Sequence, residues 1–205
     1  MQKPVKKSGR PQKFAREVVL DKWLNLFWLQ GYEATSISDL VKEAGINPPT
    51  LYASFGSKDE VFALVMERYM TRYLQPVMAS IDEADLSVPA RVERFLQRFI
   101  DVITQPNHPR GCMLLSALFV WHKQPSQTVS ALNSSGKAFF TAFCHLIEQG
   151  IATGEIRAVG TPEETAIYIL TFEKGLAMQA KAGVARETLY RISEHFVNSL
   201  RVKTA

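Results

Sequence analysis

A short polar segment near the N-terminus carries the residues whose chemistry is easiest to interpret. The outward positions of a predicted helix here are Asn47, Pro48, Pro49, Thr50, Ala53 and Ser54, none of them charged or bulky. Such a helix can approach the DNA major groove closely. Thr50 can hydrogen-bond a base edge or touch a thymine methyl, the prolines can contact methyl groups, and the Tyr52 hydroxyl can bind a phosphate.

Groups that could bind phosphate flank this helix on both sides. Thr35 or Ser36, with the free N–H groups that start the preceding helix, face one flank of the groove. Ser57 and Lys58 start the following helix and form a second anion site, and Arg10 could enter the adjacent minor groove. The predicted DNA contacts are therefore Arg10, Thr35, Ser36, Asn47, Pro48, Pro49, Thr50, Tyr52, Ser57 and Lys58.

The elements that must position these residues are two short amphipathic helices joined by a glycine turn. Apolar residues at helical spacing between residues 37 and 44 predict the first helix, and Ser36 with Asp39 provides its cap. Gly45 can take the positive φ that a tight turn needs. Asn47 is a good N-cap, and Pro48 suits the first helical position. This is the layout of a helix-turn-helix, which places its second helix in the major groove.

Composition limits the class of protein. The chain has 205 residues, of which 46% are hydrophobic and 21% charged, as in ordinary globular proteins. No apolar run approaches the roughly 18 residues of a membrane span, and no signal peptide is recognisable. The two cysteines, Cys112 and Cys144, do not form a CxxC pair, which favours a cytoplasmic chain with reduced thiols.

The positive charge is concentrated at the N-terminus. Six lysines and arginines precede the first acid, Glu17, and the remainder has 18 basic against 20 acidic residues. We expect residues 1–13 to be a basic flexible arm that suits a polyanion partner. The alternative is a solvated tail that serves solubility alone.

The whole chain is predicted to be all-α, with about nine helices. We expect a three-helix helix-turn-helix domain at 14–60 and a helical ligand-binding and dimerisation domain at 61–205. No alternation of apolar and polar β-branched residues suggests a strand. The alternative for residues 34–58 is two packed helices without any DNA-binding role.

The order and spacing of residues 9–70 closely resemble the DNA-binding domain of the TetR family of transcriptional regulators. The segments that carry the resemblance are Gly9–Pro11, Leu26–Phe27, Gly31–Ile37, Ala44–Ile46, Leu51–Tyr52 and Phe55–Lys58. The resemblance implies a homodimer that binds operator DNA and is usually released by a ligand. It also implies that the positions held here by Thr35, Ser36, Asn47, Pro48, Pro49, Thr50, Tyr52 and Lys58 commonly touch DNA.

The C-terminal half is rich in aromatic and sulfur side chains, which could line a cavity for a small apolar effector or form ordinary core. The candidate pocket residues are Phe95, Phe99, Met113, Phe119, Trp121, Phe139, Phe143 and Phe172. Apolar stripes on the last two helices could form a four-helix bundle between two subunits, or an intrachain hairpin. The candidate dimer residues are Ile169, Phe172, Leu176, Ala180, Leu189, Ile192, Phe196 and Leu200.

Other functions receive little support from the sequence. We expect no catalytic residue, metal or cofactor, because no nucleophile elbow, phosphate-binding loop or metal-ligand spacing is present. A helical interaction module and a small helical enzyme remain the alternatives to a regulator. The expected partners are double-stranded operator DNA, a second copy of the chain and a small effector, without a membrane. The operator, the effector, the target genes, the sign of regulation and a redox role for either cysteine stay open.

Overall fold

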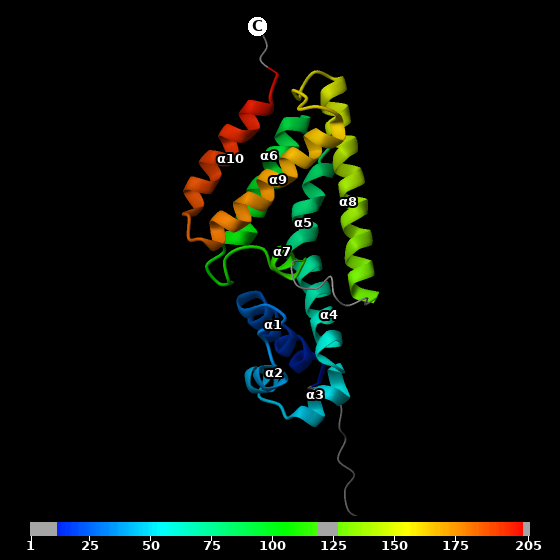
Figure 1. The fold of residues 1–205 in the computed structure, drawn as a ribbon, viewed down its shortest axis with the longest axis vertical. Helices are drawn as coiled ribbons and strands as arrows, with labels where there is room; N and C mark the ends of the chain where they lie inside the picture. Colours follow the sequence, from blue (N-terminus) through cyan, green and yellow to red (C-terminus); the bar gives the residue numbers. More distant parts are fainter. Residues whose placement is uncertain (1–11, 119–126, 203–205) are drawn as a thin grey trace, which may run out of the picture. The chain divides into compact units, whose positions relative to one another are not determined.

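The computed structural model describes residues 12–118 and 127–202. Over these ranges the regular structure is helical, apart from one isolated bridge between Ile156 and Arg201. If the unbroken run from Lys58 to Asp82 is counted once, the described residues form nine helical segments (Figure 1). The predicted all-α class is therefore confirmed. No helix among the described residues is long and apolar enough to cross a membrane.

The chain divides into two compact units, Met1–Glu67 and Arg68–Ala205. This division falls later along α4 than the domain boundary expected after residue 60. The first unit contains α1 (Gln12–Gln30), α2 (Ile37–Ala44), α3 (Pro48–Phe55) and the first part of α4 (Lys58–Tyr69).

The core of the first unit is built around Trp23. Its indole is fully buried, and its Nε1 donates a hydrogen bond of 2.8 Å to the carbonyl oxygen of Leu40 on α2. The edge of the Trp23 ring also meets Phe55 on α3, with ring centroids 4.7 Å apart. Leu40 and Leu51 are fully buried as well. One residue of α1 therefore fixes both helices of the helix-turn-helix.

The turn between α2 and α3 has the geometry that the sequence predicts. Gly45 has φ 69°, in the left-handed region where a side chain would be strained. The N–H of Gly45 bonds to Lys42, and the N–H of Ile46 bonds to the Val41 carbonyl. These bonds satisfy the last carbonyls of α2 and end the helix within one turn.

The second unit begins with the end of α4, which continues into a long helical run. A π-helical turn (Met70–Leu74) follows α4, then α5 (Gln75–Met78) and a 3₁₀ turn (Ala79–Asp82). Pro76 lacks an N–H, and its ring would crowd the carbonyl of Arg72 in a regular α-helix. The wider π turn just before Pro76 accommodates this proline without ending the run.

The second unit is arranged around α6 (Val88–Thr104). Helices α5, α8, α9 and α10 all contact α6 (Figure 1). The other helices of this unit are α7 (Met113–Leu118), α8 (Gln127–Ala152), α9 (Pro162–Lys181) and α10 (Arg186–Leu200). The buried side of α6 carries Val92, Phe95, Leu96, Phe99, Ile100 and Ile103. Burial of this stripe on several sides explains why α6 is the centre of the unit.

Candidate functional site

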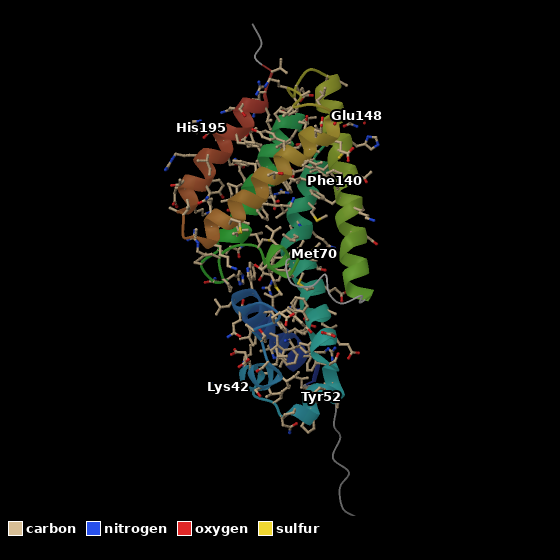
Figure 2. The ribbon with its side chains drawn as sticks, viewed as in Figure 1. Lys42, Tyr52, Met70, Phe140, Glu148 and His195 are labelled. Carbon is tan, nitrogen blue, oxygen red and sulfur yellow. The ribbon has the colours of Figure 1, made fainter. Side chains whose placement is uncertain are left out.

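Helix α3 presents an exposed, uncharged surface. Asn47, Pro48, Pro49 and Thr50 are all exposed, whereas Leu51 on the opposite side is fully buried. Tyr52 is 53% exposed, and Figure 2 shows it on α3 with its side chain at the surface of the first unit. The structure therefore brings together five of the residues predicted from sequence to contact DNA.

The start of α3 offers few free amides. Pro48 and Pro49 have no N–H, the Thr50 N–H bonds to the Asn47 side-chain oxygen at 2.9 Å, and the Leu51 N–H bonds to the Asn47 carbonyl at 3.1 Å. A helix start usually offers several free donors to an anion. Within the described ranges, the Asn47 N–H is the one donor at this start without an acceptor, so α3 would read DNA mainly through side chains and methyl contacts.

The starts of α2 and α4 are each occupied by their own acid. The Ser36 N–H bonds to the Asp39 carboxylate at 2.8 Å, and the Ser57 N–H bonds to the Glu60 carboxylate at the same distance. The Ser36 hydroxyl and then the Ser36 N–H lower the pKa of Asp39, and the Ser57 N–H and then the Ser57 hydroxyl lower the pKa of Glu60. The Ser36 and Ser57 hydroxyls donate to the same carboxylates, which reduces their availability for phosphate. Both boxes therefore fix helix starts, as the sequence predicted for Ser36 and Asp39.

Donors for phosphate remain beside these boxes. Within the described ranges, the N–H groups of Ile37 and Ser38 have no acceptor. The ammonium of Lys58 lies over the Tyr32 ring, 4.2 Å from its centroid. The Tyr32 hydroxyl in turn donates to Asp59, and burial followed by this bond raises the pKa of Tyr32. The Tyr32 ring therefore positions the Lys58 ammonium through a cation–π contact, which the sequence analysis missed.

Thr35 differs from the other predicted DNA contacts that the structure describes. Thr35 is fully buried, and its hydroxyl donates a hydrogen bond of 2.7 Å to the Gly31 carbonyl. The prediction that the Thr35 side chain reaches DNA is therefore wrong, because the hydroxyl closes the turn after α1 instead. Arg10 lies outside the described residues.

The aromatic residues of the second unit divide into two groups. Phe95, Phe139 and Phe143 form one cluster with ring centroids 5.5–5.7 Å apart, and Phe99 and Met113 are buried. Tight packing of these side chains matches the ordinary-core alternative as well as a cavity wall. The other two predicted pocket residues, Phe119 and Trp121, lie outside the described residues.

Phe172 contacts different aromatic residues from the Phe95 cluster. Its ring stacks on Phe196 of α10 with centroids 3.8 Å apart, and the Tyr168 ring lies 5.3 Å from the Phe196 centroid. These contacts join α9 to α10 within one chain, so the assignments of Phe172 to a pocket and to a dimer interface both stay predictions.

The predicted dimer stripes mostly face the chain's own core. Six of their residues are buried within one subunit, as the intrachain alternative proposed: Ile169, Leu176, Ala180, Leu189, Phe196 and Leu200. Their assignment to an interface is corrected, because the same spacing fits packing on α6. The outward side of α9 and α10 instead shows Tyr168, 44% exposed, and Ile192, 38% exposed, beside the Phe172–Phe196 stack.

A polar cluster inside the second unit was missed by the sequence analysis. The buried Tyr69 hydroxyl donates to the Cys112 sulfur at 3.3 Å and accepts the Met113 N–H at 3.3 Å. Burial raises the pKa of Tyr69 and that of Cys112, the latter to about 11, and the charge of Glu173 contributes to both. Glu173 lies four residues after Ile169 on α9, so its place on a buried stripe was readable from the sequence.

An open hollow of about 440 Å³ also lies in the second unit, beside the π-helical turn. Its lining residues are Arg72, Tyr73, Pro76, Val77, Arg98, Asp101, Val102, Gln105 and His108. Several of these polar groups already have partners. Arg98 pairs with Glu83 at 2.7 Å, Asp101 pairs with Arg186, and the Tyr73 hydroxyl lies 3.0 Å from His108 Nε2. The polar lining is therefore explained by internal contacts.

Comparison with known proteins identifies both units. Residues 19–65 match the family model described as bacterial regulatory proteins, tetR family, and residues 88–196 match the tetracyclin repressor-like C-terminal domain. The HTH-type transcriptional repressor ComR of Escherichia coli (strain K12) is 30% identical over 190 residues, which cover 92% of this chain and 90% of ComR.

Solved structures of TetR-family regulators are similar to this chain as well. A cysteine mutant of the TetR family transcriptional regulator CifR, complexed with 26-bp double-strand operator DNA, is 29% identical with a TM-score of 0.73. The match covers 93% of this chain and 99% of that chain. AibR has a TM-score of 0.77 at 16% identity, over 93% of this chain and all of AibR, which shows a shared fold.

The chain belongs to the TetR family of bacterial transcriptional regulators. It is a DNA-binding regulator, and α2 and α3 are its helix-turn-helix.

Proposed function

We propose that this chain is a homodimeric repressor that binds a pseudo-palindromic operator through α3 and is released from it by a small effector. The observation that carries the proposal is the exposed surface of α3, whose only bulky outward side chain is Tyr52. Thr50 and the two prolines would contact base edges and thymine methyls, and Lys58 would neutralise a phosphate.

The outward apolar surface of α9 and α10 supports the dimer. Tyr168 and Ile192 are exposed there, half-buried Phe172 stacks on the buried Phe196 beneath them, and Gly175 leaves open space on α9. Exposed aromatic and aliphatic groups of this kind are common at the centre of protein interfaces. Two copies joined through this surface would present two α3 helices to successive major grooves, about 34 Å apart.

Control by an effector is supported by the match of the second unit to the tetracyclin repressor-like C-terminal domain. An effector releases DNA only if it binds more tightly to the conformation that cannot bind DNA. We place this regulator in the cytoplasm, where its operator would lie, and we propose no catalytic role for it.

A salt titration tests the proposal. A duplex is first selected from a random-sequence library with the wild-type protein, and its affinity is then measured by fluorescence anisotropy at several salt concentrations. Binding should weaken steeply with salt, because bound lysines and arginines release counterions. Affinity that does not change with salt, or failure to select any sequence, would contradict the proposal.

Two variants separate sequence reading from phosphate binding. Thr50→Ala should weaken binding at one base step, by about 1–3 kcal/mol, and leave other sequences unaffected. Lys58→Gln should weaken all duplexes alike and reduce the salt slope by about 1. If Thr50→Ala weakened every duplex equally, its assignment as a base-reading residue would be wrong.

A further inference from the structure

Arg16 links the start of α1 to the end of α3. Its Nη1 donates a hydrogen bond of 2.6 Å to the carbonyl oxygen of Ser54, in the last turn of α3. The guanidinium also lies over the Phe55 ring, 4.5 Å from its centroid. Arg16 is half-buried, so the bond and the ring contact are partly shielded from water. One side chain of α1 therefore holds both of the last two residues of α3.

Helix α3 does not stabilise its own C-terminal end. It has eight residues, fewer than the roughly 12–15 that an isolated helix needs, and its last turn contains no basic residue. The last carbonyls of a helix lack partners within it and carry a partial negative charge. The Gly56 N–H satisfies the Tyr52 carbonyl, and Arg16 satisfies the Ser54 carbonyl. Arg16 thus supplies from another helix the basic cap that α3 lacks.

Few other contacts connect α1 directly to α3. Among the described residues, α1 packs closely on α2 and α2 on α3, whereas α1 and α3 approach each other at few places. Trp23 also contacts the Phe55 ring. Because Trp23 follows Arg16 by about two turns, both side chains lie on the same side of α1. Together they hold the end of α3 against α1.

We propose that Arg16 is a positioning residue for sequence reading, because it fixes the direction of α3. Thr50 lies one turn before Ser54 on this short helix, so a tilt at the end held by Arg16 would move Thr50. Hydrogen bonds to base edges weaken steeply away from their best distance and angle. This inference rests on the proposed function, since Arg16 acts through α3. The family match covers residues 19–65 and so does not assign a role to Arg16.

The ratio of two affinities tests this role. Fluorescence anisotropy measures the affinity of the full chain for the duplex selected with the wild type and for a scrambled duplex of the same composition. Non-specific binding depends on phosphate contacts, so a positioning residue affects the selected duplex alone. Arg16→Met keeps the length of the side chain but removes its donors and charge. It should lower the ratio about tenfold, the value of one base contact, and leave the salt slope on the scrambled duplex unchanged.

Two further variants of α1 complete the design. Lys22 makes the same kind of contact with the other helix, since its Nζ donates a hydrogen bond of 3.1 Å to the Glu43 carbonyl near the end of α2. Lys22→Met should leave the ratio unchanged. Arg16→Lys keeps the charge and a donor but loses the planar group over Phe55, so its ratio should fall between those of the wild type and Arg16→Met. Urea unfolding verifies that each variant is folded, and Arg16→Lys carries the test if Arg16→Met does not fold.

A direct phosphate contact is the competing role, because the guanidinium has N–H groups besides the one bonded to Ser54. In that case Arg16→Met would weaken both duplexes by the same factor and reduce the salt slope by about 1, which would overturn the positioning role. An unchanged ratio in Arg16→Met, or an equal loss in Lys22→Met, would overturn it as well. If the wild type selects a duplex and binds it with a steep salt dependence, any of these results leaves the regulator standing. If no duplex is selected, the proposed function itself fails.

Discussion

Asn47 has two separable roles in this account, and substitutions at this position can distinguish them. Its side-chain oxygen caps α3 by accepting the Thr50 N–H at 2.9 Å. The same residue is exposed on the surface that we propose faces DNA. Because Pro48 and Pro49 have no N–H, Thr50 carries the first amide of α3, and only the cap satisfies it.

The two roles predict different rankings of the variants in stability and in DNA affinity. Asn47→Ala removes the cap and should lower the free energy of unfolding by about 1 kcal/mol, within a usual range of about 0.5–2. Asn47→Asp keeps an acceptor oxygen and should stay within a few tenths of a kcal/mol of the wild type. On DNA, however, the new negative charge at about 8 Å from a phosphate costs about 2 kcal/mol at an effective dielectric constant of about 20. Asn47→Asp should therefore bind its selected duplex about 30-fold more weakly than the wild type.

Urea unfolding followed by tryptophan fluorescence gives the stabilities, since Trp23 lies in the same core as α3. Fluorescence anisotropy at one fixed salt concentration gives the affinities. We expect Asn47→Asp to be about as stable as the wild type but to bind DNA more weakly. If affinity simply followed stability, so that Asn47→Asp bound like the wild type and only Asn47→Ala was impaired, Asn47 would be a cap alone and the placement of α3 against phosphates would be refuted.

Three further predictions concern the second unit. Ile192→Asp should convert a dimer into a monomer in analytical ultracentrifugation. Leu29→Asp, at a more exposed apolar site in the first unit (69% against 38%), should not, and a dimer that persists with Ile192→Asp would exclude the α9–α10 surface. Iodoacetamide at pH 8 should label Cys144 well before Cys112, because Cys144 is partly exposed whereas burial raises the pKa of the Cys112 thiol to about 11. Equal labelling rates for the two thiols in the native protein would contradict this. Because burial raises the pKa of Glu173 in the folded state to about 7, above its ordinary value of 4.5, the folded state binds the extra proton, and stability should fall as pH rises through this interval. Glu173→Gln should match the wild type near pH 5 and exceed it by up to about 3 kcal/mol near pH 8, and identical pH profiles for the two proteins would count against this pKa.

Local signals predicted the first unit well because its determinants are close in sequence. The cap at Asn47, the turn at Gly45 and the box at Ser36 each depend on residues within four positions of one another. Such interactions depend only on neighbouring residues, so their residue types can be recognised directly. Thr35 was misplaced for the opposite reason: its burial depends on a hydrogen bond to Gly31 and on the packing of α1, which spacing alone does not show.

The second unit was harder to predict because its helices are amphipathic on more than one side. Ile169, Phe172 and Leu176 share one side of α9, yet Ile169 and Leu176 are buried in the core whereas Phe172 is half-buried and stacks on Phe196 of α10. Helical periodicity shows that a side is apolar but not whether its partner is the same chain or a second copy. Glu173 carried a readable signal, since an acid within a buried stripe is unusual.

The central claim is that α3 lies in the major groove, and a cleavage probe on α3 tests it most directly. Ala53 is exposed on α3, and Ala53→Cys in a chain with Cys112→Ala and Cys144→Ser can carry an iron chelate that cuts nearby DNA. The account predicts two clusters of cuts on the selected duplex, about one helical turn or ~34 Å apart and related by the pseudo-palindrome. Cuts scattered along the duplex, or a bound complex that shows no cuts from this position, would contradict the claim that α3 reads the operator.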